Sequence, residues 1–301
     1  MGMYLMSEVI RRTRENRGIS QQELCDGICS LQTLNRIEAG HQTPSRNNFK
    51  ALMERMGKNG DRYQLCLHGD METLIEWEKF NLLLANREFE VLDEELQKIE
   101  KGIDVEDVVN RQFLLRIRAI ADYKMGRIDV LQERELLEKA LKLTVPEYRD
   151  CQLPIGIYSR NEIFIFCNIA STYNESNDID TAIMMLEQLK KYFQNTSIDL
   201  DERSITEVFA MQNLARYYGI KGDAEKAYQI EKDLMKMCLL TGKGGLLTNI
   251  LYNLAFEEEV LEKDTIRSQM HFMQAYYIAE IFNNKKMMSH IKNHIKETSK
   301  I

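Results

Sequence analysis

A group of side chains around residue 32 has the chemistry needed to recognise DNA bases. Gln32 and Asn35 carry carboxamides that can pair with adenine through two hydrogen bonds, and Leu31 can contact a thymine methyl group. Thr33 lies between them, and the spacing predicts a helix over Leu31–Ala39 that presents all four side chains. An ordinary solvated helix face explains the same pattern, and the helix pattern alone gives the two interpretations about equal weight.

Three asparagines form a second set of candidate residues. Asn168, Asn213 and Asn253 are each followed two residues later by alanine. A carboxamide has both donors and an acceptor, so a row of asparagines can hydrogen-bond the main chain of an extended peptide without depending on its side chains. The alternative is that these asparagines only join adjacent helices to one another.

The sequence lacks the arrangements typical of enzymes. It contains no Ser-His-Asp signature, no glycine-rich phosphate loop and no nucleotide-binding fingerprint. His290 and His294 have a spacing that could hold a metal ion, but no third ligand accompanies them, so we predict that they are surface histidines. The six cysteines include no Cys-x-x-Cys pair. We therefore expect no enzymatic activity, no cofactor and no metal site.

The composition predicts a helical, globular chain. Of its 301 residues 44% are hydrophobic and only three are proline, which excludes collagenous and largely disordered classes. Apolar residues recur at three- and four-residue spacings nearly throughout, which indicates an all-α fold. The chain has no long uncharged apolar run, and its start does not resemble a secretory signal, so we expect a cytoplasmic protein with no membrane association.

The charge is unevenly distributed along the chain. Residues 1–68 hold 10 Lys and Arg against 7 Asp and Glu, whereas residues 69–301 hold 30 against 40, and the net charge is −7. A basic segment attracts polyanions such as nucleic acid. The first 68 residues are therefore the part of the chain suited to DNA.

The elements that must position the residues around 32 are short helices. Ser20 and Glu23 form a capping-box pattern, Gly27 lies in a tight turn, and Ser30 is placed to cap the next helix. Two short helices joined by such a turn are the elements of a helix-turn-helix, whose second helix enters the major groove. The helices that flank this pair are predicted over 7–16, with Arg11, Arg12, Arg14 and Arg17 on its exposed sides, and over 46–56.

These residues also carry a resemblance to a known family. Gln21-Gln22-Glu23-Leu24, Leu34 to Gly40, and Pro44-Ser45 resemble the XRE and Cro/cI-like family of helix-turn-helix domains over about 60 residues. The resemblance implies that Gln21 binds a phosphate and that residues 31, 32, 33 and 35 face base edges. It also implies contacts to the DNA backbone from Arg36, Gln42, Thr43 and Arg46. The alternative for Glu38, within the same motif, is a simple ion pair with a nearby arginine.

The remainder of the chain is predicted to form helix pairs. The expected pairs cover 71–84 with 88–101, 108–125 with 130–143, 160–175 with 180–193, 205–219 with 224–239, and 247–261 with 266–283, before a last helix over 285–296. Asn168-Ile-Ala, Asn213-Leu-Ala and Asn253-Leu-Ala superpose, and Asn177-Asp178 and Gly222-Asp223 follow the first two at matching distances. These copies resemble degenerate tetratricopeptide repeats, which stack as a right-handed superhelix.

In tetratricopeptide domains the repeated asparagine faces a concave groove, so the resemblance implies a peptide-binding groove along the three asparagines. Neighbouring side chains would then determine which peptide binds. The implied peptide-binding residues are Asn168, Asn213, Asn253, Phe164, Cys167, Gln212, Arg216, Asn249, Tyr252 and Phe256.

The order of the two parts resembles the RRNPP group of peptide-sensing transcriptional regulators from Gram-positive bacteria, which contains PlcR- and Rgg-like proteins. Residues 24–30 also resemble the shortened turn of PlcR-type members. The resemblance implies a DNA-binding domain over 1–68 and a repeat domain over 69–301 for peptide binding and homodimerisation. A short quorum-sensing oligopeptide would bind the repeats and alter how the dimer engages an operator in double-stranded DNA. The alternative function is a protein-docking scaffold with a weak DNA-binding head.

Overall fold

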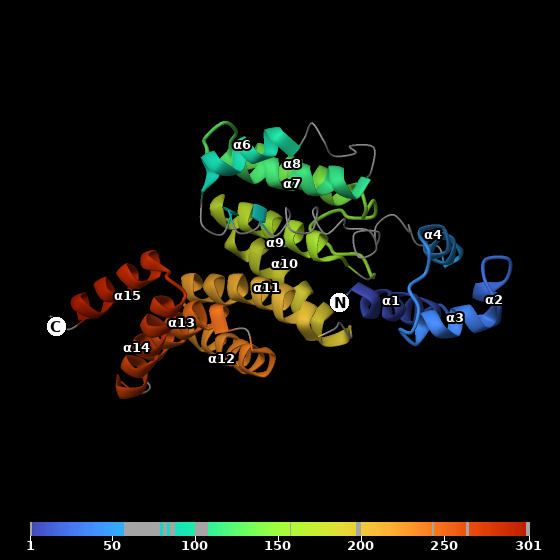
Figure 1. The fold of residues 1–301 in the computed structure, drawn as a ribbon. Helices are drawn as coiled ribbons and strands as arrows, with labels where there is room; N and C mark the ends of the chain where they lie inside the picture. The colour runs from blue at the N-terminus through green and yellow to red at the C-terminus, as the bar shows by residue number, and fades with distance from the viewer. Residues whose placement is uncertain are drawn as a thin grey trace. The chain divides into compact units, whose positions relative to one another are not determined.

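The computed structural model describes residues 2–56, 79–80, 83–84, 88–99, 108–156, 158–196, 200–242, 244–262 and 265–298. Contacts between residues divide the chain into two units, Met1–Thr172 and Tyr173–Ile301. The described residues form helices, one isolated β-bridge between Arg149 and Gln152, and no strand. The all-α prediction is therefore confirmed (Figure 1). The predicted domain boundary at residue 68 and the lone Trp77 lie outside the described residues.

Four helices form the head, which we define as residues 2–56. They are α1 (Gly2–Asn16), α2 (Gln21–Cys25), α3 (Leu31–Glu38) and α4 (Arg46–Arg55), coloured blue in Figure 1. They surround one apolar core, to which every helix contributes: Met6, Val9, Ile10, Leu24, Cys25, Leu34, Ile37, Phe49, Leu52, Met53 and Met56. The first helix begins before the predicted Ser7. The additional residues include Met6, which is 2% exposed and packs in this core.

The rest of the first unit consists of longer helices. These are α6 (Phe89–Ile99), α7 (Val108–Lys124), α8 (Val130–Lys142) and α9 (Arg160–Glu175), the last of which continues into the second unit. Asp129 begins α8 with a capping box to Gln132. Pro146 and Pro154 lie in the segment between α8 and α9, which the predicted helices over 130–143 and 160–175 also left outside any helix. Of the predicted helix over 71–84, the structure describes only residues 79–80 and 83–84, which are helical.

Six helices make up most of the second unit. They are α10 (Ile179–Asn195), α11 (Leu200–Lys221), α12 (Ala224–Thr241), α13 (Leu247–Val260), α14 (Thr265–Ile281) and α15 (Lys285–Thr298), with the short 3-10 helix η2 (Gly244–Leu246) before α13. Successive helices pack on one another from α10 to α15. The start of α11 at Leu200 rather than Ile205 adds one turn, in which Arg203 forms an ion pair with Glu207.

The two turns that the sequence aligned are built in the same way. Asn177 has a φ of +66° and Gly222 a φ of +87°, so each chain reversal passes through the left-handed region. The aspartate that follows caps the next helix in both cases: Asp178 accepts the N–H of Thr181 at 3.1 Å, and Asp223 accepts the N–H of Lys226 at 3.2 Å. The described helices include none that is long and apolar enough to span a bilayer.

Candidate functional site

Local hydrogen bonds shape the segment that joins α2 to α3. Ser20 Oγ accepts the N–H of Glu23 at 3.2 Å, and Glu23 Oε2 accepts the N–H of Ser20 at 2.8 Å. The bond from the Ser20 backbone holds the pKa of the Glu23 carboxyl below its usual value. Gly27 has a φ of +69°, and Ser30 Oγ accepts the N–H of Thr33 at 3.0 Å at the start of α3. The predicted capping box, turn and second cap are confirmed.

Helix α3 presents one polar face to solvent and one apolar face to the core. Leu34 and Ile37 are fully buried. The Thr33 hydroxyl lies 2.8 Å from Ser30 Oγ and is half-buried, so it is the least available of the four predicted base readers. The exposed residues of the helix that were predicted to contact DNA are Leu31, Gln32, Asn35 and Arg36. Their exposure leaves these side chains accessible to a ligand.

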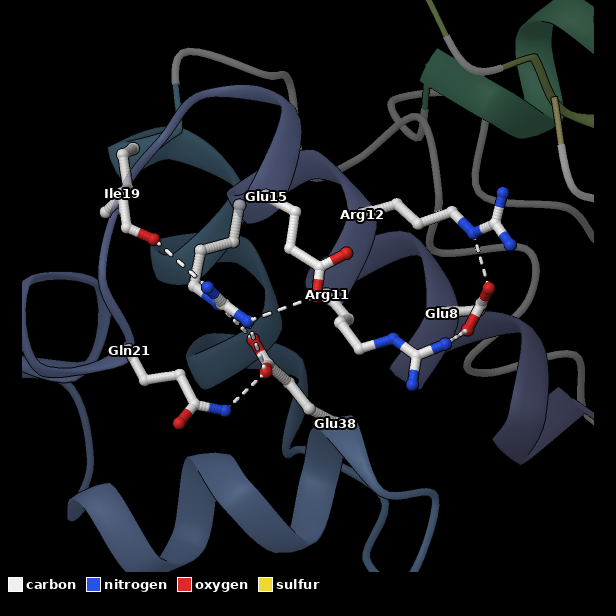
Figure 2. Close-up of polar contacts among 8 residues, drawn as sticks. Glu8, Arg11, Arg12, Glu15, Ile19, Gln21 and Glu38 are labelled. Carbon is white, nitrogen blue, oxygen red and sulfur yellow. Dashed lines mark hydrogen bonds and ion pairs between the residues drawn. The ribbon is translucent and has the colours of Figure 1, made fainter. Parts of the chain in front are cut away.

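Glu38 joins three helices of the head (Figure 2). It is 6% exposed and accepts two hydrogen bonds from Arg14, from Nε at 2.7 Å and from Nη2 at 2.9 Å. Arg14 Nη1 also donates to the carbonyl oxygen of Ile19 at 3.1 Å. The simple reading of Glu38 as the partner of an arginine is confirmed, and Arg14 is not on the exposed side of its helix as the helical pattern had placed it.

Gln21 takes part in the same cluster. Its Nε2 donates to Glu38 Oε2 at 2.6 Å (Figure 2). The amide that was predicted to bind a DNA phosphate is thus oriented by Glu38, which accepts one of its two N–H donors. Gln42 and Thr43 are exposed in the loop after α3, and Arg46 is the first residue of α4.

Arg55 is a structural residue that the sequence analysis missed. Its Nη1 donates to the carbonyl oxygens of Glu23 and Leu24 at 3.3 and 3.1 Å, and to that of Asp26. These carbonyls end α2, where a helix leaves acceptors without intrahelical partners. Nothing near Arg55 in sequence predicts a contact with a helix 29 or more residues away.

In the first unit, Asn168 belongs to a buried polar network. Arg116, which is 4% exposed, donates from Nε to Asn168 Oδ1 at 3.1 Å and from Nη1 to Asn161 Oδ1 at 3.0 Å. Its guanidinium also stacks 5.1 Å from the centre of the Phe164 ring. Burial lowers the pKa of Arg116 to about 10. Asn168 is therefore held by a buried cation on α7, which the sequence did not indicate.

In the second unit, Asn213 and Asn253 are half-buried and also have partners. Asn213 Nδ2 donates to the Phe209 carbonyl oxygen of its own helix at 3.1 Å. Asn253 Nδ2 donates to Glu231 Oε1 of α12 at 2.8 Å. Asn253 thus joins α13 to α12, as the alternative interpretation proposed. Each of these hydrogen bonds uses one polar atom of the asparagine carboxamide.

The other predicted peptide residues differ in exposure. Arg216, Asn249 and Phe256 are exposed, and Gln212 and Tyr252 are half-buried. Phe164 and Cys167 are buried, with exposed fractions of 8% and 1%, and burial raises the pKa of the Cys167 thiol. Neither side chain is available to a peptide in this structure.

Tyr252 and Phe256 contact the histidines of α15. The Tyr252 ring lies 4.9 Å from His290 and 6.0 Å from His294, and Phe256 lies 5.9 Å from His294. His294 Nε2 is 2.8 Å from Glu259 Oε2 and the side chain is 18% exposed. His294 was expected to be a surface histidine, and this was wrong because α15 packs it into an aromatic cluster with Phe272. Among the described residues, no three metal-ligating side chains form a group.

Comparisons with known proteins agree with this architecture. The family model described as Helix-turn-helix matches residues 10–62. No curated protein sequence matches the chain. Among solved structures, PlcR from Bacillus thuringiensis in complex with the peptide PapR7 and DNA is 17% identical, covers 96% of this chain and 99% of its own, and superposes with a TM-score of 0.63.

Two further structures are similar over their full length. ComR from S. thermophilus, in complex with DNA and its signalling peptide ComS, is 14% identical and covers 96% of this chain and 98% of its own, with a TM-score of 0.51. The SHP pheromone receptor Rgg2 from Streptococcus dysgalactiae is also 14% identical, covering 97% and 99%, with a TM-score of 0.50. The chain therefore has the fold of these proteins: a helix-turn-helix followed by helix pairs.

Proposed function

We propose that this chain is a cytoplasmic, DNA-binding transcriptional regulator whose helix pairs bind a short signalling peptide. The observation that carries the DNA-binding part is the exposed face of α3, with Gln32, Asn35 and Arg36 accessible to solvent on a helix held by a capped turn. A helix with this support can enter the major groove without losing core contacts, because Leu34 and Ile37 anchor its other side. We assign DNA binding to residues 1–68 and peptide binding to residues 69–301.

Within α3 the side chains have different tasks. Gln32 and Asn35 read base edges, Leu31 contacts a thymine methyl group, and Arg36 binds the phosphate backbone. One such head contacts only a few base pairs, so we propose that a homodimer binds two half-sites about one helical turn apart. The Arg14–Glu38–Gln21 cluster fixes the angle between α1, α2 and α3.

The fold shared with PlcR and ComR supports the peptide-binding part, because PlcR was solved with the peptide PapR7 and DNA, and ComR with DNA and its signalling peptide ComS. In this chain Asn213 and Asn253 would bind the peptide main chain. Asn253 donates one of its two N–H groups to Glu231, so a peptide that reorients the carboxamide would break that bond. Arg216, Asn249 and Phe256, which are exposed, would select among peptides.

A selection experiment tests the DNA-binding part. Random double-stranded DNA is enriched on the full chain, and the affinity for the selected operator is compared with that for scrambled DNA. The double variant Gln32→Ala/Asn35→Ala should lose the preference and keep the weak, salt-sensitive binding that phosphate contacts provide. Equal loss of binding to both DNAs would contradict the assignment of these residues as base readers.

A protein-docking scaffold remains the second candidate function, and one observation favours it. Helix α14 exposes Ile266, Met270, Met273, Tyr277 and Ile281, whose spacing places them along one face. In the regulator proposal this face contributes to the homodimer. Sedimentation of the purified chain alone, compared with a Met270→Lys/Tyr277→Lys variant, tests that assignment: a dimer that these changes dissociate supports it. A monomer that instead co-purifies with a different folded protein supports the scaffold.

A further inference from the structure

Two carboxyl groups are buried on α12 and α13, which pack together in the second unit. Glu231 is 1% exposed and Glu257 is 7% exposed. Glu231 Oε1 accepts the hydrogen bond from Asn253, whereas Glu231 Oε2 is buried and has no hydrogen-bond partner among the described residues. Glu257 Oε1 lies against Gly219 of α11, where a Cβ atom would approach it to 2.9 Å. The missing side chain at position 219 is what makes room for this carboxyl group.

Charged groups on the surrounding helices interact with partners other than Glu231 and Glu257. On α11, Arg203 pairs with Glu207, Lys221 with Asp180, and Arg216 with the Tyr217 hydroxyl. On α13, Glu258 pairs with His271 and Glu259 with His294. The titratable neighbours that interact electrostatically with Glu231 are Glu257 and, on its own helix, Cys238.

The basic groups on α12 also have other partners. Lys226 pairs with Asp223, Lys236 with Asp233, and Lys232 lies over the Tyr228 ring. The adjoining η2 helix consists of two glycines and a leucine, so it contributes no titratable side chain. Within the described part of the chain, no basic side chain forms an ion pair with either Glu231 or Glu257.

Burial without a cation disfavours the charged form of a carboxyl group. Burial raises the pKa of Glu231 to about 8; the negative charge of Glu257 adds to this shift, and the bond from Asn253 opposes it. Burial also raises the pKa of Glu257 to about 7. Protonation would neutralise the buried charge of Glu231 without requiring a cation beside it.

We propose that Glu231 and Glu257 form a buried proton-binding site, and that Asn253 couples this site to peptide binding. The second half of the proposal rests on the function proposed above, whereas the first half does not. A peptide that draws the Asn253 carboxamide away from Glu231 removes the one hydrogen bond that Glu231 receives from the described part of the chain, and that bond favours the carboxylate. Proton uptake and peptide binding would then favour each other, and peptide affinity would fall as the pH rises.

The same site predicts how stability depends on pH. Each carboxyl group has a pKa in the folded chain above its value in the unfolded chain. The unfolded chain therefore releases protons first as the pH rises, and stability is lost between the unfolded pKa and the folded pKa. Above about pH 8 no further loss arises from Glu231. The second unit is thus expected to be more stable at mildly acidic pH than at alkaline pH.

Thermal unfolding of the full chain between about pH 5 and about pH 9 tests the proton site without any peptide. Glutamine imitates the protonated carboxyl group, so Glu231→Gln should raise the Tm relative to wild type at alkaline pH and much less at acidic pH. The control is Glu225→Gln, the same change at an exposed position of the same helix. Its pH profile should match that of wild type. Identical profiles for Glu231→Gln and wild type would overturn the proposal.

Two further measurements keep the test decisive if Glu231→Gln folds poorly. An infrared titration of the wild-type chain should show a protonated carboxyl band that disappears only near or above neutral pH, and that band should weaken in Glu257→Gln. Asn253→Ala imitates withdrawal of the amide by a peptide and should move the titration to higher pH. Unchanged titration in Asn253→Ala would refute the coupling. If the chain failed to bind DNA or a peptide, the unfolding and infrared results would still test the proton site. The proposed function and the proton site can therefore fail separately.

Discussion

Glu38 in the head and Glu231 in the second unit are both buried carboxyl groups that join neighbouring helices, but they are neutralised in different ways. Glu38 receives two hydrogen bonds from Arg14 and one from Gln21. Glu231 receives one hydrogen bond, from the neutral amide of Asn253, and leaves an oxygen without a partner among the described residues. We therefore expect Glu38 to hold α3 firmly in the head, and we propose that the packing of α12 against α13 responds to a ligand or a proton.

Removing Arg14, the cation that pairs with Glu38, should cause the largest loss in the free energy of unfolding. Arg14→Met leaves Glu38 buried and without its charged partner, at a cost of about 3 kcal/mol or more in the free energy of unfolding. Urea unfolding of the full chain, followed by a probe in the head, measures the loss. Arg14→Met/Glu38→Leu, which removes both charges, should recover a large part of it. A single variant as stable as wild type would show that the pair contributes little.

The same substitution, glutamate to glutamine, should change stability in opposite directions at Glu38 and at Glu231. Glu38→Gln weakens the contact with Arg14 and should destabilise the head by about 1 to 3 kcal/mol. Glu231→Gln should stabilise the second unit at alkaline pH, because it removes a charge that has no counter-ion. Parallel unfolding curves at about pH 8.5 compare the two variants. Destabilisation by both changes would remove the distinction between the two sites.

Local pattern was sufficient to predict the turns and caps, and insufficient to predict the polar contacts between helices. The Ser20–Glu23 capping box and the Asn177-Asp178 turn are encoded within a few residues, so the sequence alone predicts them. Arg14 and Glu38 are 24 residues apart, and Arg116 and Asn168 are 52 apart. Such pairs depend on how helices pack, which periodicity does not determine.

The candidate site shows the same limit. Helical spacing placed Gln32 and Asn35 on an exposed face correctly, because the apolar Leu34 and Ile37 define the opposite face. Phe164 and Cys167 were expected beside a peptide, yet both are buried. Helix α9 is apolar on several sides, so its sequence does not reveal which side faces a neighbouring helix.

Removing Asn253, the neutral donor to Glu231, should lower the free energy of unfolding moderately, by an amount that depends on pH. Asn253→Ala removes the hydrogen bond that Glu231 Oε1 accepts, so neither oxygen of Glu231 keeps a partner among the described residues. The free energy of unfolding should fall by about 1 kcal/mol where the carboxyl group is charged. The cost should be smaller at about pH 5, where the group is protonated in the folded chain. Thermal unfolding at the two pH values measures the difference. A cost independent of pH would assign Asn253 a packing role only.

A half-buried ion pair of the head provides the smallest expected loss of stability. Glu8 pairs with Arg11 and Arg12 on α1, and the side chains of Glu8 and Arg12 are 29% and 28% exposed, so water screens these charges more than those of Arg14 and Glu38. Arg12→Met should therefore change the free energy of unfolding by less than about 1 kcal/mol. Measured beside Arg14→Met, it separates the effect of burial from the loss of an arginine. A cost as large as that of Arg14→Met would contradict the importance given to burial of Glu38.

The most direct test of a peptide-controlled DNA-binding protein is a fluorescence anisotropy titration of the selected operator. It is carried out with and without the peptide fraction of a culture extract, using wild type and the variant Asn213→Ala/Asn253→Ala. The account predicts that the peptides change the operator affinity of wild type and leave that of the variant unchanged, while both proteins bind the operator equally without peptide. Equal responses in the two proteins, or no preference of wild type for any operator, would contradict it.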